Sequence, residues 1–240
     1  MLTATDVGLQ RKNNEDSCAI LEESGLCVVA DGMGGHLGGE IASHIAIETV
    51  TEAFKSRPRQ GQDERKDADL LTKCIRNANK EIYRRGNADP ALKNMGTTIV
   101  AVVAGKDYVV YANVGDSRIY RLRGGELAQV TEDHSWVGEL RKKNLISDED
   151  ARSHPLKNII TRALGMEPTV EVDVKWDKAR AGDVYMLCSD GLTDLVTDSE
   201  IQRIMVKHGT SLESMAADLI EAANAGGGTD NITVGLCQIE

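Results

Sequence analysis

The chain has 240 residues, 41% of them apolar, which is enough to bury the core of one domain. Its net charge of −10 argues against a nucleic-acid partner, because a phosphate backbone would be repelled over most of the surface. No apolar run approaches the ~20 residues of a membrane helix, and the first residues do not resemble a signal peptide. Five scattered cysteines form no Cys-x-x-Cys pair and are expected to be reduced core residues. These features predict a cytoplasmic protein that binds neither nucleic acid nor a membrane.

Apolar periodicity predicts the elements of the first half of the chain. Short apolar runs between polar or glycine-rich turns indicate strands, and apolar residues at helical spacing indicate two helices joined by a mixed-charge linker. Gly86 is expected to end the second helix. The predicted strands are 3–7, 16–22 and 26–30, and the predicted helices are 40–55 and 70–85.

The second half begins with closely spaced β runs, which favour an antiparallel meander. Residues 132–164 are polar, and we interpret them as a small mobile flap subdomain over the sheet ends, with a helix start at 147–150. Two capping boxes, Thr197 with Glu200 and Thr210 with Glu213, predict two further helices. The predicted strands are 97–103, 108–114, 117–122, 126–130, 169–175, 183–189 and 232–239.

This order of elements predicts an α+β fold. Consecutive strands pair through hairpins and the helices come in two adjacent pairs, which favours a sandwich of two antiparallel β-sheets flanked by helix pairs. We expect residues 1–240 to form a single domain, with the flap at residues 132–164 inserted within it.

Four carboxylates lie at the ends of strand-like runs. Asp31 and Asp190 follow such runs, Asp116 follows one after a glycine, and Asp230 precedes the last run. An Asp-Gly pair between apolar runs is also a common hairpin turn, so each position alone has a turn as its alternative interpretation. Four together favour a cluster that holds metal ions.

The glycine-rich stretch after Asp31 leads into a helix, so a nucleotide-binding loop is another interpretation. It fits poorly, because no Gly-Lys-Ser/Thr ending is present and Leu37 stands where a dinucleotide fingerprint needs its third glycine.

A polar loop at residues 8–16 is the second candidate region. It offers Arg11 for a bidentate phosphate contact, and Glu15 with Asp16 for hard cations. The alternative is a solvated surface loop, in which Arg11 and Glu15 would contribute well under ~1 kcal/mol to stability.

Six short motifs are spread from the start of the chain to its end. They are Arg11-Lys12-Asn13-Asn14-Glu15-Asp16, Asp31-Gly32-Met33-Gly34-Gly35-His36, Met95-Gly96-Thr97-Thr98, Val114-Gly115-Asp116-Ser117-Arg118, Ser189-Asp190-Gly191-Leu192 and Gly228-Thr229-Asp230-Asn231-Ile232-Thr233-Val234. In this order they resemble the metal-dependent protein phosphatases of type 2C, in particular the short bacterial serine/threonine members. The resemblance implies that family's αββα sandwich, which agrees with the element order.

The resemblance also implies a reaction, the hydrolysis of phosphoserine and phosphothreonine by a water or hydroxide that bridges two Mn²⁺ or Mg²⁺ ions. The substrates would be phosphorylated proteins, targets of a serine/threonine kinase, and we expect a monomer. Arg11 would grip the phosphate and Glu15 would hold metal-bound waters. The implied metal ligands are Asp16, Asp31, the backbone carbonyl of Gly32, Asp190 and Asp230.

Bacterial members of the family are similar in having a third, weaker metal, which here implies Asp116 together with Asp190. The alternative for Asp116 is a simple hairpin turn. The sequence departs from the family pattern at one position, because Met33 stands where eukaryotic members have a histidine that is proposed to protonate the leaving group. His36, His134 and His154 have no assigned role. The alternative function is a non-hydrolytic phosphopeptide-binding module on the same fold, which would be free to lose the metal-binding aspartates.

Overall fold

The computed structural model describes residues 1–34, 37–57, 62–147, 150–151 and 154–240. The described strands are β1 (Leu2–Asp6), β2 (Asp16–Leu21), β3 (Leu26–Met33), β4 (Gly96–Thr97), β5 (Ile99–Ala104), β6 (Tyr108–Val114), β7 (Arg118–Arg123), β8 (Glu126–Gln129), β9 (Asp173–Lys178), β10 (Val184–Cys188) and β11 (Ile232–Gln238). The described α-helices are α1 (Gly38–Lys55), α2 (Glu64–Ala88), α3 (Trp136–Lys142), α5 (Asp190–Thr193), α6 (Asp198–His208) and α7 (Leu212–Ala225).

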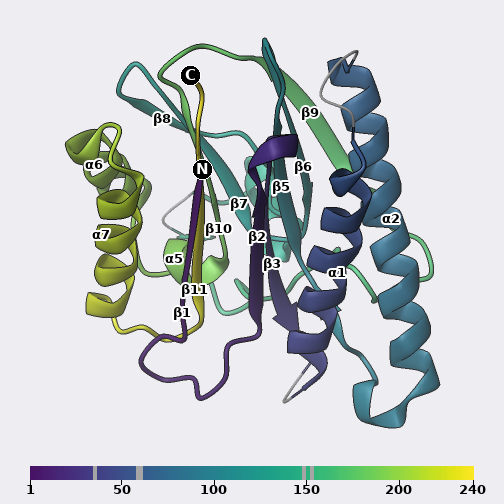
Figure 1. Cartoon of the computed structure of the whole chain (residues 1–240). Coiled ribbons are helices and arrows are strands. Elements are labelled where there is room, and N and C mark those ends of the chain that lie inside the picture. The colour runs from purple at the N-terminus through teal and green to yellow at the C-terminus, as the bar shows by residue number, and fades with distance from the viewer. Residues whose placement is uncertain (35–36, 58–61, 148–149, 152–153) are drawn as a thin grey trace.

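Two antiparallel sheets form the centre of the molecule, with α1 and α2 outside one sheet and α6 and α7 outside the other (Figure 1). One sheet has the strand order β2-β3-β5-β6-β9, with β4 paired to β3. The other has the order β1-β11-β10-β7-β8. The predicted sandwich of two antiparallel sheets flanked by helix pairs is therefore confirmed.

Three apolar layers hold the sandwich together. The first lies between α1, α2 and their sheet, and Phe54 and Ile75 are fully buried there. The second lies between the two sheets around Val29 and Leu187, and the third lies under α6 and α7. Each fully buried side chain of this size contributes about 1.5–3 kcal/mol, so the helices are fixed by their apolar faces more than by intrinsic propensity.

Local capping explains where the helices begin and end. α2 begins at Glu64, earlier than predicted, because the Asp63 carboxylate accepts a hydrogen bond from Lys66 N at 2.8 Å. Gly86 lies inside α2 and does not end it. The Thr197 cap is confirmed, with Oγ1 accepting from Glu200 N at 3.3 Å.

The second predicted capping box, Thr210 with Glu213, is wrong, although the helix that it predicted is present as α7. α7 begins at Leu212, with Ser211 as the residue before it and no side-chain cap. Thr210 stays outside the helix because Ser211 N donates to the His208 carbonyl at 3.0 Å, closing the turn after α6.

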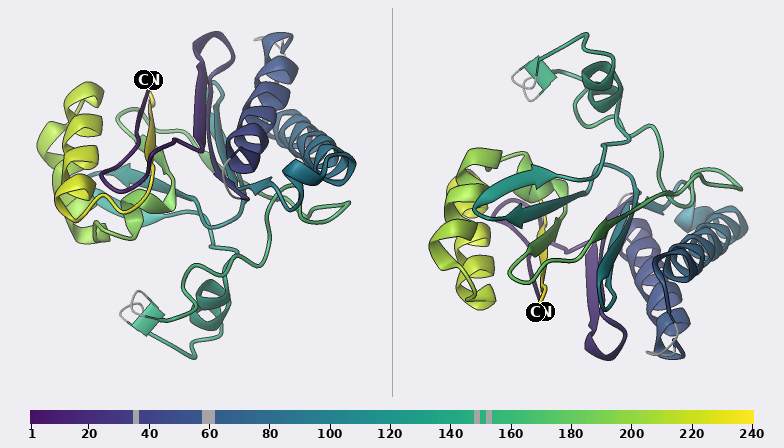
Figure 2. Two further views of the ribbon diagram at one scale, coloured as in Figure 1. Left: turned by 90° about the horizontal axis from the view of Figure 1, so that it is seen from below. Right: turned by 90° about the horizontal axis from the view of Figure 1, so that it is seen from above.

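After β8 the chain leaves the sandwich, and the part of residues 132–164 around α3 stands away from it (Figure 2), whereas His134 and Leu164 near the two ends of this range are buried. Residues 132–164 contain α3, a helix that their polar composition did not predict, which begins where Ser135 Oγ accepts from Gly138 N at 3.1 Å. The helix start predicted at 147–150 lies partly outside the described residues. The strand predicted at 169–175 begins and ends later, as β9 (Asp173–Lys178), because its pairing with β6 begins only at Asp173, opposite Asn113.

Candidate metal centre

The β2–β3 hairpin brings the first two candidate carboxylates together. Asp16 opens β2 and Asp31 lies near the end of β3, and the antiparallel register places the two residues directly opposite each other. Asp16 is only 9% exposed, and its Oδ2 accepts a hydrogen bond from Ser189 Oγ at 2.8 Å. Ser189 directly follows β10 of the second sheet, so this bond joins the ends of the two sheets at the site.

The backbone of Asp31 is fixed by two threonines from the Met95–Thr98 motif. The Asp31 carbonyl accepts from Thr98 N at 2.9 Å and from Thr97 Oγ1 at 2.8 Å. The Asp31 N–H in turn donates to Thr98 Oγ1 at 3.0 Å. Sequence reasoning noted this motif but gave it no role, and the structure assigns it the positioning of Asp31.

Asp190 and Asp230 come from the second sheet. β10 runs into Asp190, and Asp230 comes just before β11, and because these strands are antiparallel neighbours the two aspartates lie at the same edge. Gly191 is required there, because a Cβ at that position would collide with the backbone carbonyl of Asn231. The structure thus gathers three of the four predicted strand-end carboxylates, Asp31, Asp190 and Asp230, together with Asp16 of the polar loop at one end of the sandwich.

Asn231 is a residue whose role the sequence analysis missed. Its Oδ1 accepts from Glu15 N at 2.8 Å, and its Nδ2 donates to the carbonyls of Val7 and Asn13 at 3.0 and 2.9 Å. One amide thereby holds both ends of the 8–16 loop against the start of β11. No local sequence signal marks this role, because all the hydrogen-bond partners of its side chain are more than 200 residues away in the chain.

Arg11 lies at the exposed side of this group. Its Nη2 donates to Asp230 Oδ2 at 2.6 Å, and the two side chains are 52% and 37% exposed. An accessible guanidinium beside a partly exposed carboxylate is placed to meet an incoming anion.

Glu15 lies beside Gly32 and the first turn of α1. The Glu15 carbonyl accepts from Gly32 N at 3.1 Å, and a Cβ on Gly39 would collide with Glu15 Oε2. Only glycine at position 39 therefore leaves room for this carboxylate next to the Asp31–Gly32 turn.

Burial of several carboxylates close together is the main electrostatic feature of the centre, and their mutual repulsion adds to it. Burial raises the pKa of Asp16 to about 6, with the Asp230 charge adding to the effect. Burial, followed by the neighbouring aspartates, raises the pKa of Asp31 and of Asp190 well above the usual range. Carboxylates gathered in this way need a compensating cation to remain ionised together at neutral pH.

Asp116 is 8% exposed and lies at the turn between β6 and β7. Its Oδ1 is buried and has no hydrogen-bond partner, which is costly for a carboxylate oxygen. Burial raises its pKa to about 7, and among the neighbouring charges that raise the pKa of Asp190 the Asp116 carboxylate is the strongest. Asp116 therefore adjoins the main group through Asp190.

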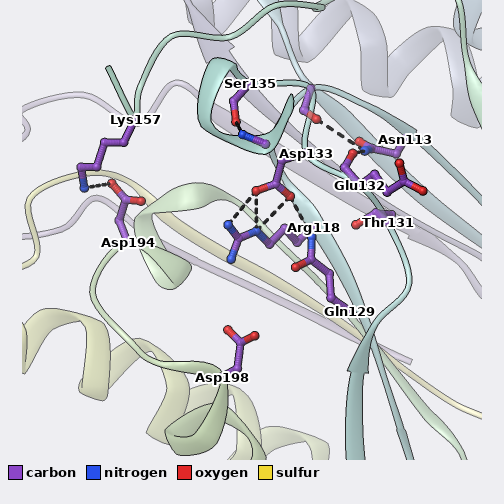
Figure 3. Close-up of polar contacts among 12 residues, drawn as sticks. Asn113, Arg118, Gln129, Thr131, Glu132, Asp133, Ser135, Lys157, Asp194 and Asp198 are labelled. Carbon is purple, nitrogen blue, oxygen red and sulfur yellow. Dashed lines mark hydrogen bonds and ion pairs between the residues drawn. The ribbon is translucent and has the colours of Figure 1, made fainter. Parts of the chain in front are cut away.

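A cavity of about 380 Å³ opens between the flap segment, α5 and α6, with Asp116 and Asp190 on its wall. Figure 3 shows the ion pairs around it. Arg118 donates to Asp133 Oδ2 at 2.6 Å on one side, and Lys157 from the flap segment reaches Asp194 at 2.6 Å on another.

The described histidines of the flap segment have structural positions. His134 is 7% exposed, and its Nδ1 accepts from Gly115 N at 3.0 Å while its Nε2 faces Asp173 at 3.3 Å. Burial, with the Arg162 charge, lowers the pKa of His134, so the ring is neutral and fixes the flap to the β6–β7 turn. His154 Nδ1 accepts from Leu156 N at 3.1 Å within a turn. His36 lies outside the described residues.

The donor set fits hard divalent cations. Its members offer only oxygen atoms, which Mg²⁺ and Mn²⁺ prefer. Within the described residues, no group of three or more His, Cys, Asp or Glu side chains could hold an ion by itself. Ions here would thus need the Gly32 carbonyl and water as further ligands, in the manner usual for Mg²⁺.

Comparison with known proteins places this geometry in a family. A family model described as protein phosphatase 2C matches residues 10–230. The chain belongs to the protein phosphatase 2C family. It is 44% identical over 233 residues to the serine/threonine phosphatase stp of Listeria welshimeri, covering 96% of this chain and 92% of that one.

Solved structures of serine/threonine phosphatases share the fold. Serine/threonine phosphatase Stp1 from Staphylococcus aureus matches with a TM-score of 0.93 at 35% identity, over 100% of this chain and 94% of that one. The catalytic domain of the serine/threonine protein phosphatase PstP, solved in complex with two manganese ions, matches with a TM-score of 0.88 at 37% identity. That match covers 99% of this chain and 96% of the PstP chain.

Proposed function

We propose that this phosphatase hydrolyses phosphoserine and phosphothreonine in proteins, using two Mn²⁺ or Mg²⁺ ions held by Asp16, Asp31, the Gly32 carbonyl, Asp190 and Asp230. The observation that carries the proposal is the meeting of these aspartates from both sheets at one edge, with Arg11 beside them. When bound, the ions supply positive charge for the phosphoryl oxygens and activate water.

The residues of the chain then have distinct tasks. Arg11 orients the phosphate through its guanidinium, which is exposed and lies beside Asp230. Glu15 holds waters of the centre from its place next to Gly32. Thr97, Thr98 and Asn231 keep the ligands in position. Met33, at the end of β3, has no proton to give, so the acid that protonates the leaving group must be another residue or water.

We further propose that the enzyme acts as a monomer in the cytoplasm on targets of a serine/threonine kinase, and that residues 132–164 form a flap subdomain within the single domain 1–240. Support comes from the five free cysteines, four of which are buried, and from the way the part of the segment around α3 stands away from the sandwich (Figure 2). None of the described helices is both long and apolar enough to cross a membrane.

The experiment that tests the function is release of phosphate from p-nitrophenyl phosphate and from a phosphothreonine peptide, with and without Mn²⁺. Metal-dependent turnover of both is expected. A non-hydrolytic phosphopeptide-binding module would instead bind the peptide and release no phosphate.

Arg11→Ala should lower kcat/KM by about tenfold to a hundredfold, which corresponds to the ~1.5–3 kcal/mol of a charge-assisted hydrogen bond. Metal affinity should not weaken, because the variant removes a partner that competes for Asp230. Calorimetric titration with Mn²⁺ measures this, with Arg203→Ala on the exposed face of α6 as the control. Weaker metal binding in Arg11→Ala would assign the arginine to the metal centre instead.

We also propose that Asp116, together with Asp190, holds a third and weaker ion, because its buried Oδ1 lacks a partner. Asp116→Ala should lose one ion, keep the other two, and be slower on both an aryl phosphate and a phosphopeptide. Crystallographic metal occupancy and rates measure this. Asp107→Ala, in the exposed β5–β6 turn, is the matched control. Unchanged occupancy and rates in Asp116→Ala would make it a turn residue.

A further inference from the structure

A separate cavity of about 290 Å³ begins at the end of β3, where Met33 forms part of its wall. The rest of the wall comes from residues 160–171, which are the end of the flap segment and part of the stretch between it and β9. Its apolar part includes Met33, Ala163, Met166 and Val170, and its polar part includes Glu167 and Glu171.

This cavity adjoins the metal centre through β3. Asp31 and Met33 are two residues apart in that strand, so their side chains leave the same face about 7 Å from each other. A peptide whose phosphoresidue lies at Asp31 therefore has its neighbouring side chains within reach of the cavity.

The wall of the cavity is held firmly. Asn79 of α2 is 1% exposed, and its side chain accepts from Gly165 N at 2.8 Å and donates to the Glu167 carbonyl at 3.1 Å. Leu164 is paired with Thr97 by two backbone hydrogen bonds of 2.9 and 3.1 Å. The same Thr97 positions Asp31, so the cavity and the metal centre share one support.

The ionised groups of the cavity favour a cation. The Arg162 guanidinium is committed to Asp173, because its Nη1 donates to Asp173 Oδ1 at 2.7 Å. The Glu167 side chain is exposed at the rim, and that of Glu171 is 77% exposed with only a 3.6 Å approach to Arg162. Two flexible methionines and two rim carboxylates suit a long aliphatic side chain that ends in a positive charge.

We propose that this cavity is a specificity site that selects phosphoproteins with a lysine or arginine near the phosphoresidue. The aliphatic stem lies on Met33 and Met166, and the cationic end lies at Glu167 and Glu171. The inference rests on the proposed function, because the phosphate must occupy the metal centre for the flanking residue to reach the cavity.

The test uses phosphothreonine peptides that differ only in a lysine or a glutamine, placed at each flanking position in turn. In the unmodified enzyme, one position should give a kcat/KM about fivefold higher with lysine, the size expected for a partly exposed charge pair. Glu167→Lys should reverse that preference, and Glu171→Gln should reduce it. Glu213→Lys, an equal charge change on the exposed first turn of α7, should leave the preference unchanged.

The readout is the ratio of kcat/KM for the two peptides within each variant, so a general loss of folding or metal does not move it. Equal rates for the lysine and glutamine peptides at every position would overturn the inference and leave the phosphatase function intact. A lysine preference that survives Glu167→Lys would place the recognition elsewhere and also overturn it. Failure to hydrolyse any phosphopeptide in the presence of Mn²⁺ would instead count against the proposed function.

Discussion

Asp31→Asn should reduce phosphatase activity on the order of a thousandfold toward every substrate. Asp31 lies at the centre of the carboxylate group, because the charges of Asp16, Asp190, Asp116 and Asp230 all raise its pKa. Loss of its charge weakens the attraction for cations that the chemistry requires, and a thousandfold loss corresponds to about 4 kcal/mol of transition-state stabilisation. Steady-state rates on an aryl phosphate and a phosphopeptide measure the loss.

The same variant should make the metal-free protein more stable. Removing one of several carboxylates that repel each other lowers the cost of burying the rest. The melting temperature in EDTA should therefore rise or hold while activity disappears, and Asp69→Asn on the exposed face of α2 should change neither quantity. A variant that loses activity and melts lower in EDTA would indicate a damaged fold and not a lost ligand.

Removal of divalent ions should abolish turnover and destabilise the protein most at neutral pH. The folded-state pKa values of Asp16 and Asp116, about 6 and about 7, lie above the ordinary value of 3.8. The folded state thus binds more protons than the unfolded state between these limits, so stability falls as the pH rises from about 4 to 7.

Urea unfolding in EDTA at a series of pH values measures this trend. Added Mn²⁺ should restore stability by an amount that grows with pH, because the ion replaces the protons that the carboxylates lose. Metal-free protein with full activity would contradict metal dependence, and a metal-free stability that rises between pH 4 and 7 would contradict the electrostatic account of the site.

Local patterns predicted the sandwich and its strand-end carboxylates, because apolar periodicity directly reports which face of an element is buried. Asp31 and Asp190 could be recognised for that reason, since each follows a run of buried residues. Boundary errors arose where a distant partner decides the outcome. β9 begins at Asp173 because its pairing with β6 starts there, opposite Asn113. Thr210 lies in a turn that the hydrogen bond from Ser211 N to the His208 carbonyl closes.

The supporting residues of the site could not be predicted, because their contacts are remote in the chain. Asn231 holds Glu15 across 216 positions, and Thr98 holds Asp31 across 67. His134 is a further case, since its place in a polar segment gave it no assigned role, whereas the structure buries it with Nδ1 accepting from Gly115 N. Sequence patterns identify groups that carry charge more readily than the groups that orient them.

The hydrogen bonds by which Asn231 holds the 8–16 loop have a consequence for folding during synthesis. Glu15 and Asp16 are synthesised early, whereas Asp230 and Asn231, on which the geometry of the 8–16 loop depends, emerge from the ribosome only after more than two hundred further residues. A growing chain can fold its first helix pair and much of one sheet during translation and still be catalytically silent. Activity would thus appear only when β11 docks between β1 and β10, so an unfinished copy left by a stalled ribosome could not remove phosphates from the cell's proteins.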